Sequence, residues 1–186
     1  MKSAKVITLL AMSILMVALT ATAGQAENIK WRDIIGIVEA GNVVGLGNQG
    51  FPAPGVPGGA PWSTLGGRAK VNLETGHLQF QVKGLVLAAG TFTPLAFHGL
   101  PIGTTGGIQQ VEGTLVCDVS GGPGGANPSV LVDTDPVPLS ATGDAQFNGK
   151  VTLPNACNDP DIAFLIRIVD PPFTGVWIAN GAVLDR

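Results

Sequence analysis

Tyrosine is missing from this chain of 186 residues, and aromatic residues make up only 5% of it. Charged residues are also scarce, at 12%, and the 13 acidic residues outnumber the 10 Lys and Arg. The basic residues are few and scattered along the sequence, unlike those of a nucleic-acid-binding protein, so we expect no nucleic acid as a partner. The missing tyrosines also argue against a binding surface of the usual aromatic kind.

Motifs of catalysis are missing as well. The sequence holds no Gly-x-Ser-x-Gly, no His-Glu-x-x-His and no glycine-rich phosphate loop followed by Lys. Its two histidines are His77, in an expected turn, and His98, near an expected strand end, and neither has the partners that orient a catalytic imidazole. We therefore expect no enzyme. A hydrolase with dispersed carboxylates is the least favoured alternative.

The N-terminus has the layout of a secretory signal peptide. Lys2 and Lys5 precede an uncharged run over residues 6–20, and small residues then offer cleavage after Ala23 or Ala26. The run is short for a membrane span, and no later stretch is apolar for long enough to be one.

We therefore expect residues 1–26 to be a signal peptide and residues 27–186 to form a single β-domain, secreted into the periplasm or out of the cell. Loss of Lys2 and Lys5 would leave 8 basic residues against 13 acidic ones, a net charge of −5. No membrane span remains after cleavage in this interpretation.

The two cysteines, Cys117 and Cys157, are 40 residues apart. In an exported chain such a pair predicts a structural disulfide. A metal site or a reactive thiol is disfavoured, because neither cysteine has a His or a second Cys close by in the sequence.

Glycine (27 residues) and proline (14 residues) are plentiful and separate short apolar runs from one another. The pattern favours an all-β fold, an antiparallel β-sandwich or barrel-like domain with long Gly/Pro-rich loops, preceded by the helix of the signal peptide. The two long loops are expected at residues 41–67 and 118–128.

Residues 68–83 carry the clearest strand pattern. Apolar and polar residues alternate on both sides of the turn Glu74–His77, which predicts a hairpin with one face in the core. Symmetrical folding places Leu73 opposite Leu78. The apolar face then consists of Ala69, Val71, Leu73, Leu78, Phe80 and Val82.

Further strands are expected at residues 109–117, 130–132, 137–139 and 144–153, with Cys117 pointing into the core. The run Ile162–Val169 is apolar on both parities apart from Arg167, which predicts a central strand covered on both faces. Gly149 is expected to mark a bulge or close packing.

Two more hairpins are expected from turn dipeptides. Asn180-Gly181 is a strong type I′ signal between residues 176–179 and 182–184. Gly41-Asn42 lies between residues 34–40 and 43–46, where a short helix around residues 29–35 is the alternative.

Candidate ligand-binding residues are few. Trp62 and Trp177 are candidates for a sugar or surface-polymer platform, with Trp62 as an exposed anchor in the Gly/Pro-rich loop; core packing is the competing interpretation for both. Oxygen ligands grouped in loops suit Ca²⁺, so a calcium site is a further candidate, against ordinary turn chemistry. Its ligands would be Asp133, Asp135, Asp159 and Asp161.

The stretch from Gly67-Arg68-Ala69-Lys70-Val71 through Thr75-Gly76 to Val82-Lys83-Gly84-Leu85 resembles the opening of CHRD domains, which are extracellular β-domains. Those domains continue into a paired-histidine segment, whereas Ala96-Phe97-His98 offers one histidine here. More broadly, segments including residues 111–117, 137–141 and 164–167 resemble an uncharacterised family of exported bacterial proteins. That resemblance implies export and one disulfide, and assigns no activity.

Together these observations predict a secreted or envelope-associated, non-enzymatic β-domain with a structural or binding role. Self-association through exposed strand edges is one expected form of that role. The alternative is a module that binds carbohydrate or another surface polymer.

Overall fold

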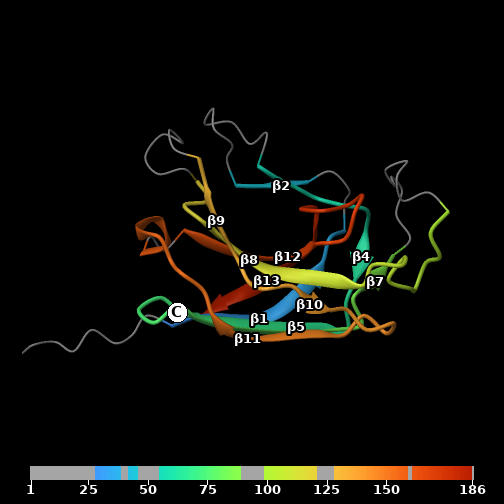
Figure 1. Cartoon of the computed structure of the whole chain (residues 1–186), viewed down its shortest axis with the longest axis horizontal. Helices are drawn as coiled ribbons and strands as arrows, with labels where there is room; N and C mark the ends of the chain where they lie inside the picture. The colour runs from blue at the N-terminus through green and yellow to red at the C-terminus, as the bar shows by residue number, and fades with distance from the viewer. Residues whose placement is uncertain are drawn as a thin grey trace, which may run out of the picture.

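The computed structural model describes residues 28–38, 42–45, 55–88, 99–120, 128–158 and 161–185. The expected signal peptide over residues 1–26, His98 and Asp159 lie outside these ranges. The fold is all-β, as predicted, and is built around one curled antiparallel sheet (Figure 1). Within the described ranges the helical structure is a single 3-10 turn, η2 (Asn155–Asn158), and no helix has the length and apolarity to cross a membrane.

The curled sheet has nine strands in the order β10-β8-β12-β13-β1-β5-β6-β11, with β9 also paired to β8. It forms a half-barrel whose terminal strands, β10 and β11, contact each other. Two small sheets, β2-β3 and β4-β7, flank it. The strands are β1 (Asn28–Gly36), β2 (Val43–Val44), β3 (Val56–Pro57), β4 (Trp62–Ser63), β5 (Gly66–Asn72), β6 (His77–Lys83), β7 (Val86–Leu87), β8 (Gln110–Cys117), β9 (Val130–Asp133), β10 (Val137–Pro138), β11 (Ala145–Lys150), β12 (Ile162–Ile168) and β13 (Trp177–Asp185).

The hairpin β5-β6 confirms the predicted core face but corrects its register. Val71, and not Leu73, lies opposite Leu78. The turn closes earlier because the Asn72 side chain accepts hydrogen bonds from the backbone N–H and the hydroxyl of Thr75, at 2.7 and 2.8 Å. The shift is two residues, and side chains alternate with a period of two, so the same residues still face the core.

β13 contradicts the predicted hairpin at Asn180-Gly181. The strand runs straight through this dipeptide, with Ile35 opposite Asn180 and Ile34 opposite Gly181 on β1. A Cβ on Gly181 would lie 2.5 Å from two ring atoms of Trp31. This glycine is therefore required by close packing and not by a turn.

The predicted first hairpin is also wrong, and so is its helical alternative. Residues 28–36 form β1, which pairs with β13 on one side and β5 on the other. β2 pairs instead with β3, with Val43 opposite Pro57. The strands that pair with β1 are distant in the sequence, so local sequence patterns do not predict these pairings.

The core lies inside the curl of the sheet. Phe164 on β12 contacts the rings of Trp31 and Phe80, each with ring centroids 5.6 Å apart. β12 is the central strand that was predicted, because its inward residues and the outward Leu165 are all buried. Gly149 packs closely, as expected: a Cβ there would lie 2.6 Å from the ring of Phe147.

The two halves of the sheet differ on their outer face. Over β12 and β13 that face is covered by the segment that carries β2 and β3 (Figure 1), where Gly59 donates its backbone N–H to the carbonyl of Trp177. On β5, β6, β11 and the first half of β1 the outward side chains are polar and mostly exposed. This uncovered half carries the candidate site.

Candidate functional site

A hollow of about 780 Å³ lies on the outer face of β1, β5, β6 and β11. We call it the basic groove, because its polar lining consists of four cations and four amides. These are Lys30, Arg32, Arg68, Lys70, Gln79, Gln81, Gln146 and Asn148. Trp31, Ala69, Phe80 and Phe147 complete the lining from the same strands.

The strand register arranges the polar side chains as a grid. Lys30 lies opposite Lys70, Lys70 opposite Gln79, and Gln79 opposite Asn148, which makes one row across four strands. A second row contains Arg68, Gln81 and Gln146. Neighbouring strands are about 4.8 Å apart, so a row spans roughly 14 Å. That length suits a segment of extended polymer better than a single small molecule.

The positive charge of the groove is compensated at the β1 side only, by Asp185. Arg32 donates from Nε to Oδ2 of Asp185 at 3.0 Å and from Nη2 to the same oxygen, which lowers the pKa of Asp185. Among the described residues, Lys30, Arg68 and Lys70 form no ion pair. Lys30 lies opposite Asp185 on β13 and its charge adds to the lowering of that pKa, so Lys30 is partly compensated, while Arg68 and Lys70 are the groove cations farther from this pair on a chain that is acidic overall.

Some amide side chains of the groove are held by hydrogen bonds within the protein, and others make none. Nε2 of Gln79 lies 2.8 Å from Nε2 of His77 and donates to Oδ1 of Asn148 at 3.2 Å. Gln81 and Gln146 lie opposite each other and make no side-chain hydrogen bond within the described ranges. They are available to donate to or accept from a bound molecule.

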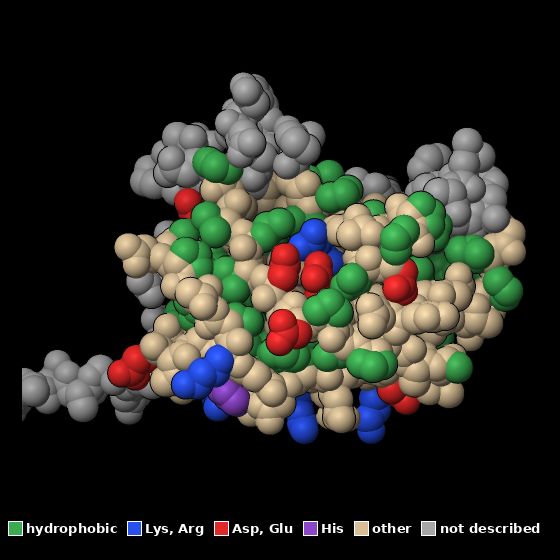
Figure 2. Space-filling model, viewed as in Figure 1, with side chains coloured by type: hydrophobic (Ala, Val, Ile, Leu, Met, Phe, Trp, Pro, Cys, Tyr) green, Lys and Arg blue, Asp and Glu red, His purple; other side chains and the backbone are tan. Residues whose placement is uncertain are grey.

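Figure 2 shows Lys and Arg side chains along the lower margin of the molecule, over the strands labelled β5 and β11 in Figure 1. Six cations project from this half of the sheet. They are Lys30, Arg32, Arg68, Lys70, Lys83 and Lys150. The last two lie outside the groove lining.

A second polar cluster surrounds Arg167 on the outer side of β12. Nη1 of Arg167 lies 2.9 Å from Oδ1 of Asp133 and 3.4 Å from Oε1 of Glu112, and Nε donates to the carbonyl of Gly175 at 3.0 Å. Burial raises the pKa of Glu112, helped by the charge of Asp133 and opposed by that of Arg167. This cluster ties β8, β9 and β12 together, and its groups are engaged with each other.

The predicted tryptophan platform does not match the structure. Trp62 is 2% exposed and Trp177 is 5% exposed, so neither ring is presented at the surface. Nε1 of Trp177 donates to the carbonyl of Asn42 at 3.2 Å, beneath the covering segment. Core packing, the competing interpretation, describes both residues.

The predicted calcium ligands are spread over the sheet. Asp133 and Asp135 lie beside a shallower hollow of about 550 Å³ near β9. Asp161 instead accepts the backbone N–H of Ser120 at 2.5 Å, toward the Cys117 end of β8, roughly 13 Å away along the strands. Asp159 lies outside the described residues, and among those described no three His, Cys, Asp or Glu side chains are grouped to hold a metal.

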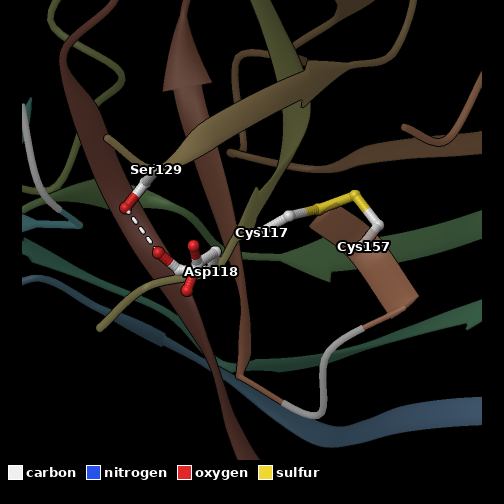
Figure 3. The surroundings of a disulfide bond; sticks show 4 residues. All are labelled: Cys117, Asp118, Ser129 and Cys157. Carbon is white, nitrogen blue, oxygen red and sulfur yellow. Dashed lines mark hydrogen bonds between the residues drawn. A yellow bond between two sulfur atoms is a disulfide. The ribbon is translucent and has the colours of Figure 1, made fainter. Parts of the chain in front are cut away.

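The predicted disulfide between Cys117 and Cys157 is present (Figure 3). It links the end of β8 to η2, with the two Cα atoms 4.8 Å apart, and both residues are fully buried. Beside it, the hydroxyl of Ser129 donates to the carbonyl of Asp118 at 2.9 Å (Figure 3). The bridge therefore anchors the rim of the half-barrel and is not part of the groove.

Sequence reasoning placed none of the groove residues in a site. The available signal is the hairpin pattern, in which Arg68 and Lys70 alternate with core residues, but that alternation alone is equally typical of an ordinary solvated face. The alignment of Lys30 with Lys70 depends on the pairing of β1 with β5, which joins segments about forty residues apart.

Comparison of the chain with protein-family models, with curated proteins and with solved structures gives no match. The basic groove is therefore interpreted from its own residues.

Proposed function

We propose that this protein is an exported, non-enzymatic binding module whose basic groove holds a stretch of an extended polar polymer, such as a carbohydrate of a cell surface or matrix. The observation that carries the proposal is the groove itself. It combines a span of roughly 14 Å with a lining of cations and amides fixed on a rigid sheet.

The chemistry of the lining supports binding over catalysis. Of the described residues that line the groove, none is a carboxylate, an imidazole or a hydroxyl, which are the commonest general acids, bases and nucleophiles, although Lys30 and Lys70 carry amines. Amides both donate and accept hydrogen bonds, which suits the hydroxyl-rich surface of a sugar chain. The buried disulfide supports an oxidising, extracytoplasmic location.

The test is an array of soluble neutral and acidic polysaccharides probed with the purified protein. A polymer that binds is then titrated against the double variant Gln81→Ala/Gln146→Ala, which removes the two free amides while leaving backbone pairing intact. We expect the dissociation constant to rise at least about fivefold, since each lost hydrogen bond contributes roughly 1 kcal/mol.

Gln110→Ala is the matched control, because Gln110 is an exposed amide on β8, outside the groove. Its affinity should equal that of the wild type. Failure to bind any polymer on the array, or equal binding by the double variant, would contradict the proposal.

A further inference from the structure

We infer that the polymer bound in the basic groove is an acidic polysaccharide, recognised through Lys30, Arg68 and Lys70. This inference rests on the proposed function and narrows it to one class of ligand. Neutral sugar binding leaves one feature of the groove unexplained, namely the opposition of like charges.

Lys30 and Lys70 are direct cross-strand partners on the same face of the sheet. Like charges in such positions destabilise a sheet. Asp185 lies opposite Lys30 on the other side of β1, but its carboxylate pairs with Arg32, and Lys30 makes only the smaller contribution to the lowered pKa of Asp185. Neither lysine forms an ion pair among the described residues. A fold that keeps an unfavourable pair on its surface is consistent with a functional demand for positive charge at that place.

The charge distribution strengthens this interpretation. Two of the three ion pairs described by the structure belong to Arg167, on another part of the sheet, and the third to Arg32. Arg68 and Lys70, which form no ion pair among the described residues, thus stand out on a chain with more acidic than basic residues. Such a patch attracts an anionic polymer and favours it over a neutral polymer of the same shape.

Two other anionic partners fit the groove less well. A membrane surface is bound with the help of exposed apolar side chains, and none of the large exposed apolar residues lines the groove. Single-stranded nucleic acid is held by stacking on exposed aromatic rings, whereas Trp31 and Phe80 in the lining are 3% exposed and the half-buried Phe147 stacks on Phe80.

The experiment compares two matched pairs of polymers, polygalacturonate with its methyl-esterified form and dextran sulfate with dextran. We expect tighter binding of the acidic member of at least one pair, weakened as salt is raised. The double variant Arg68→Gln/Lys70→Gln should raise the dissociation constant of that polymer roughly fivefold to twentyfold, from the usual contribution of exposed charge pairs.

The matched control is Lys83→Gln/Lys150→Gln, which removes two charges from the same half of the sheet but outside the groove lining. Its dissociation constant should change less than about twofold. A second readout is thermal stability. Lys70→Gln removes the opposition to Lys30 and should raise Tm by about 1–3 °C, whereas Lys83→Gln, opposite Gly66, should not.

Equal binding of neutral and acidic members, with no effect of Arg68→Gln/Lys70→Gln, would overturn the inference and leave the proposed polymer-binding function standing. Binding to vesicles containing phosphatidylglycerol, without binding to either acidic polymer, would overturn it in favour of a membrane surface. Failure to bind any of the four polymers or those on the array would overturn the inference together with the proposed function.

Discussion

Gly181 on β13 packs directly against the indole of Trp31 on β1, so closely that a Cβ on the glycine would lie 2.5 Å from ring atoms Cγ and Cδ1. Trp31 is buried and contacts Phe164 in the core, so its ring cannot swing outward without opening the sheet. The contact fixes how closely these two central strands approach each other.

The substitution Gly181→Ala should therefore lower the free energy of unfolding by about 1–3 kcal/mol, the usual cost of overpacking a core. Chemical denaturation of the purified protein measures the change. Ala182→Ser, at the next position of β13, is the control and should stay within about 0.5 kcal/mol of the wild type. A Gly181→Ala variant as stable as the wild type would show that the indole has room to move.

The same glycine explains one limit of prediction from sequence. Asn180-Gly181 has the composition of a tight hairpin turn, and only the pairing of β13 with β1 reveals that the glycine is there for packing. Strand periodicity was a better guide, because burial on one face is a local property. It predicted the core faces of β5 and β6 even though the register was shifted by two residues.

The candidate site was harder to predict for a related reason. Lys70 and Gln79 belong to one hairpin, so the local pattern places them on the same face, although the predicted register misses their direct pairing by two residues. Their alignment with Lys30 on β1 and Asn148 on β11 depends on pairings between distant segments. Conversely, the Gly/Pro-rich sequence around Trp62 leaves both an exposed anchor and core packing open, and the strand β4 places the ring in the core.

Removal of the disulfide should weaken the fold strongly. The bridge closes a loop with a sequence separation of 40 residues, for which chain entropy predicts a contribution of about 4 kcal/mol. We expect the double variant Cys117→Ala/Cys157→Ala to unfold at much lower denaturant concentration than the oxidised wild type. Wild-type protein treated with reductant in denaturant should behave similarly, and a variant with unchanged stability would contradict the assigned role.

Glu112 should give stability an unusual pH dependence. Its pKa is raised in the folded state, chiefly by burial, so the folded protein holds this proton more tightly than the unfolded chain does. The resulting stabilisation is fully present below the ordinary pKa of a glutamate and is lost as pH rises through the raised value. The variant Glu112→Gln cannot titrate at this position.

We therefore expect the wild type to lose stability relative to Glu112→Gln as pH rises from below about 4.5 toward neutrality. Denaturation curves of both proteins across this range give the difference directly. A difference that stays constant with pH, or that changes in the opposite direction, would contradict the raised pKa.

Arg167 should be the most sensitive residue of the polar cluster on β12. Its side chain is 14% exposed, forms ion pairs with Asp133 and Glu112, and donates a hydrogen bond to the carbonyl of Gly175. Replacement by Met keeps much of the side-chain volume but leaves two neighbouring carboxylates without their cation. Breaking a buried ion pair in this way costs 3–5 kcal/mol, and partial exposure reduces the expected loss to about 2–4 kcal/mol at neutral pH.

Two comparisons separate this electrostatic role from simple packing. The loss in Arg167→Met should shrink as pH falls, because protonated carboxyls no longer need a cation. Arg167→Lys should be intermediate, since an ammonium group restores a charge near Asp133 but cannot reproduce the guanidinium's simultaneous bond to Gly175. Equal losses for Met and Lys at every pH would mean that the shape of the arginine, and not its charge, holds β8, β9 and β12 together.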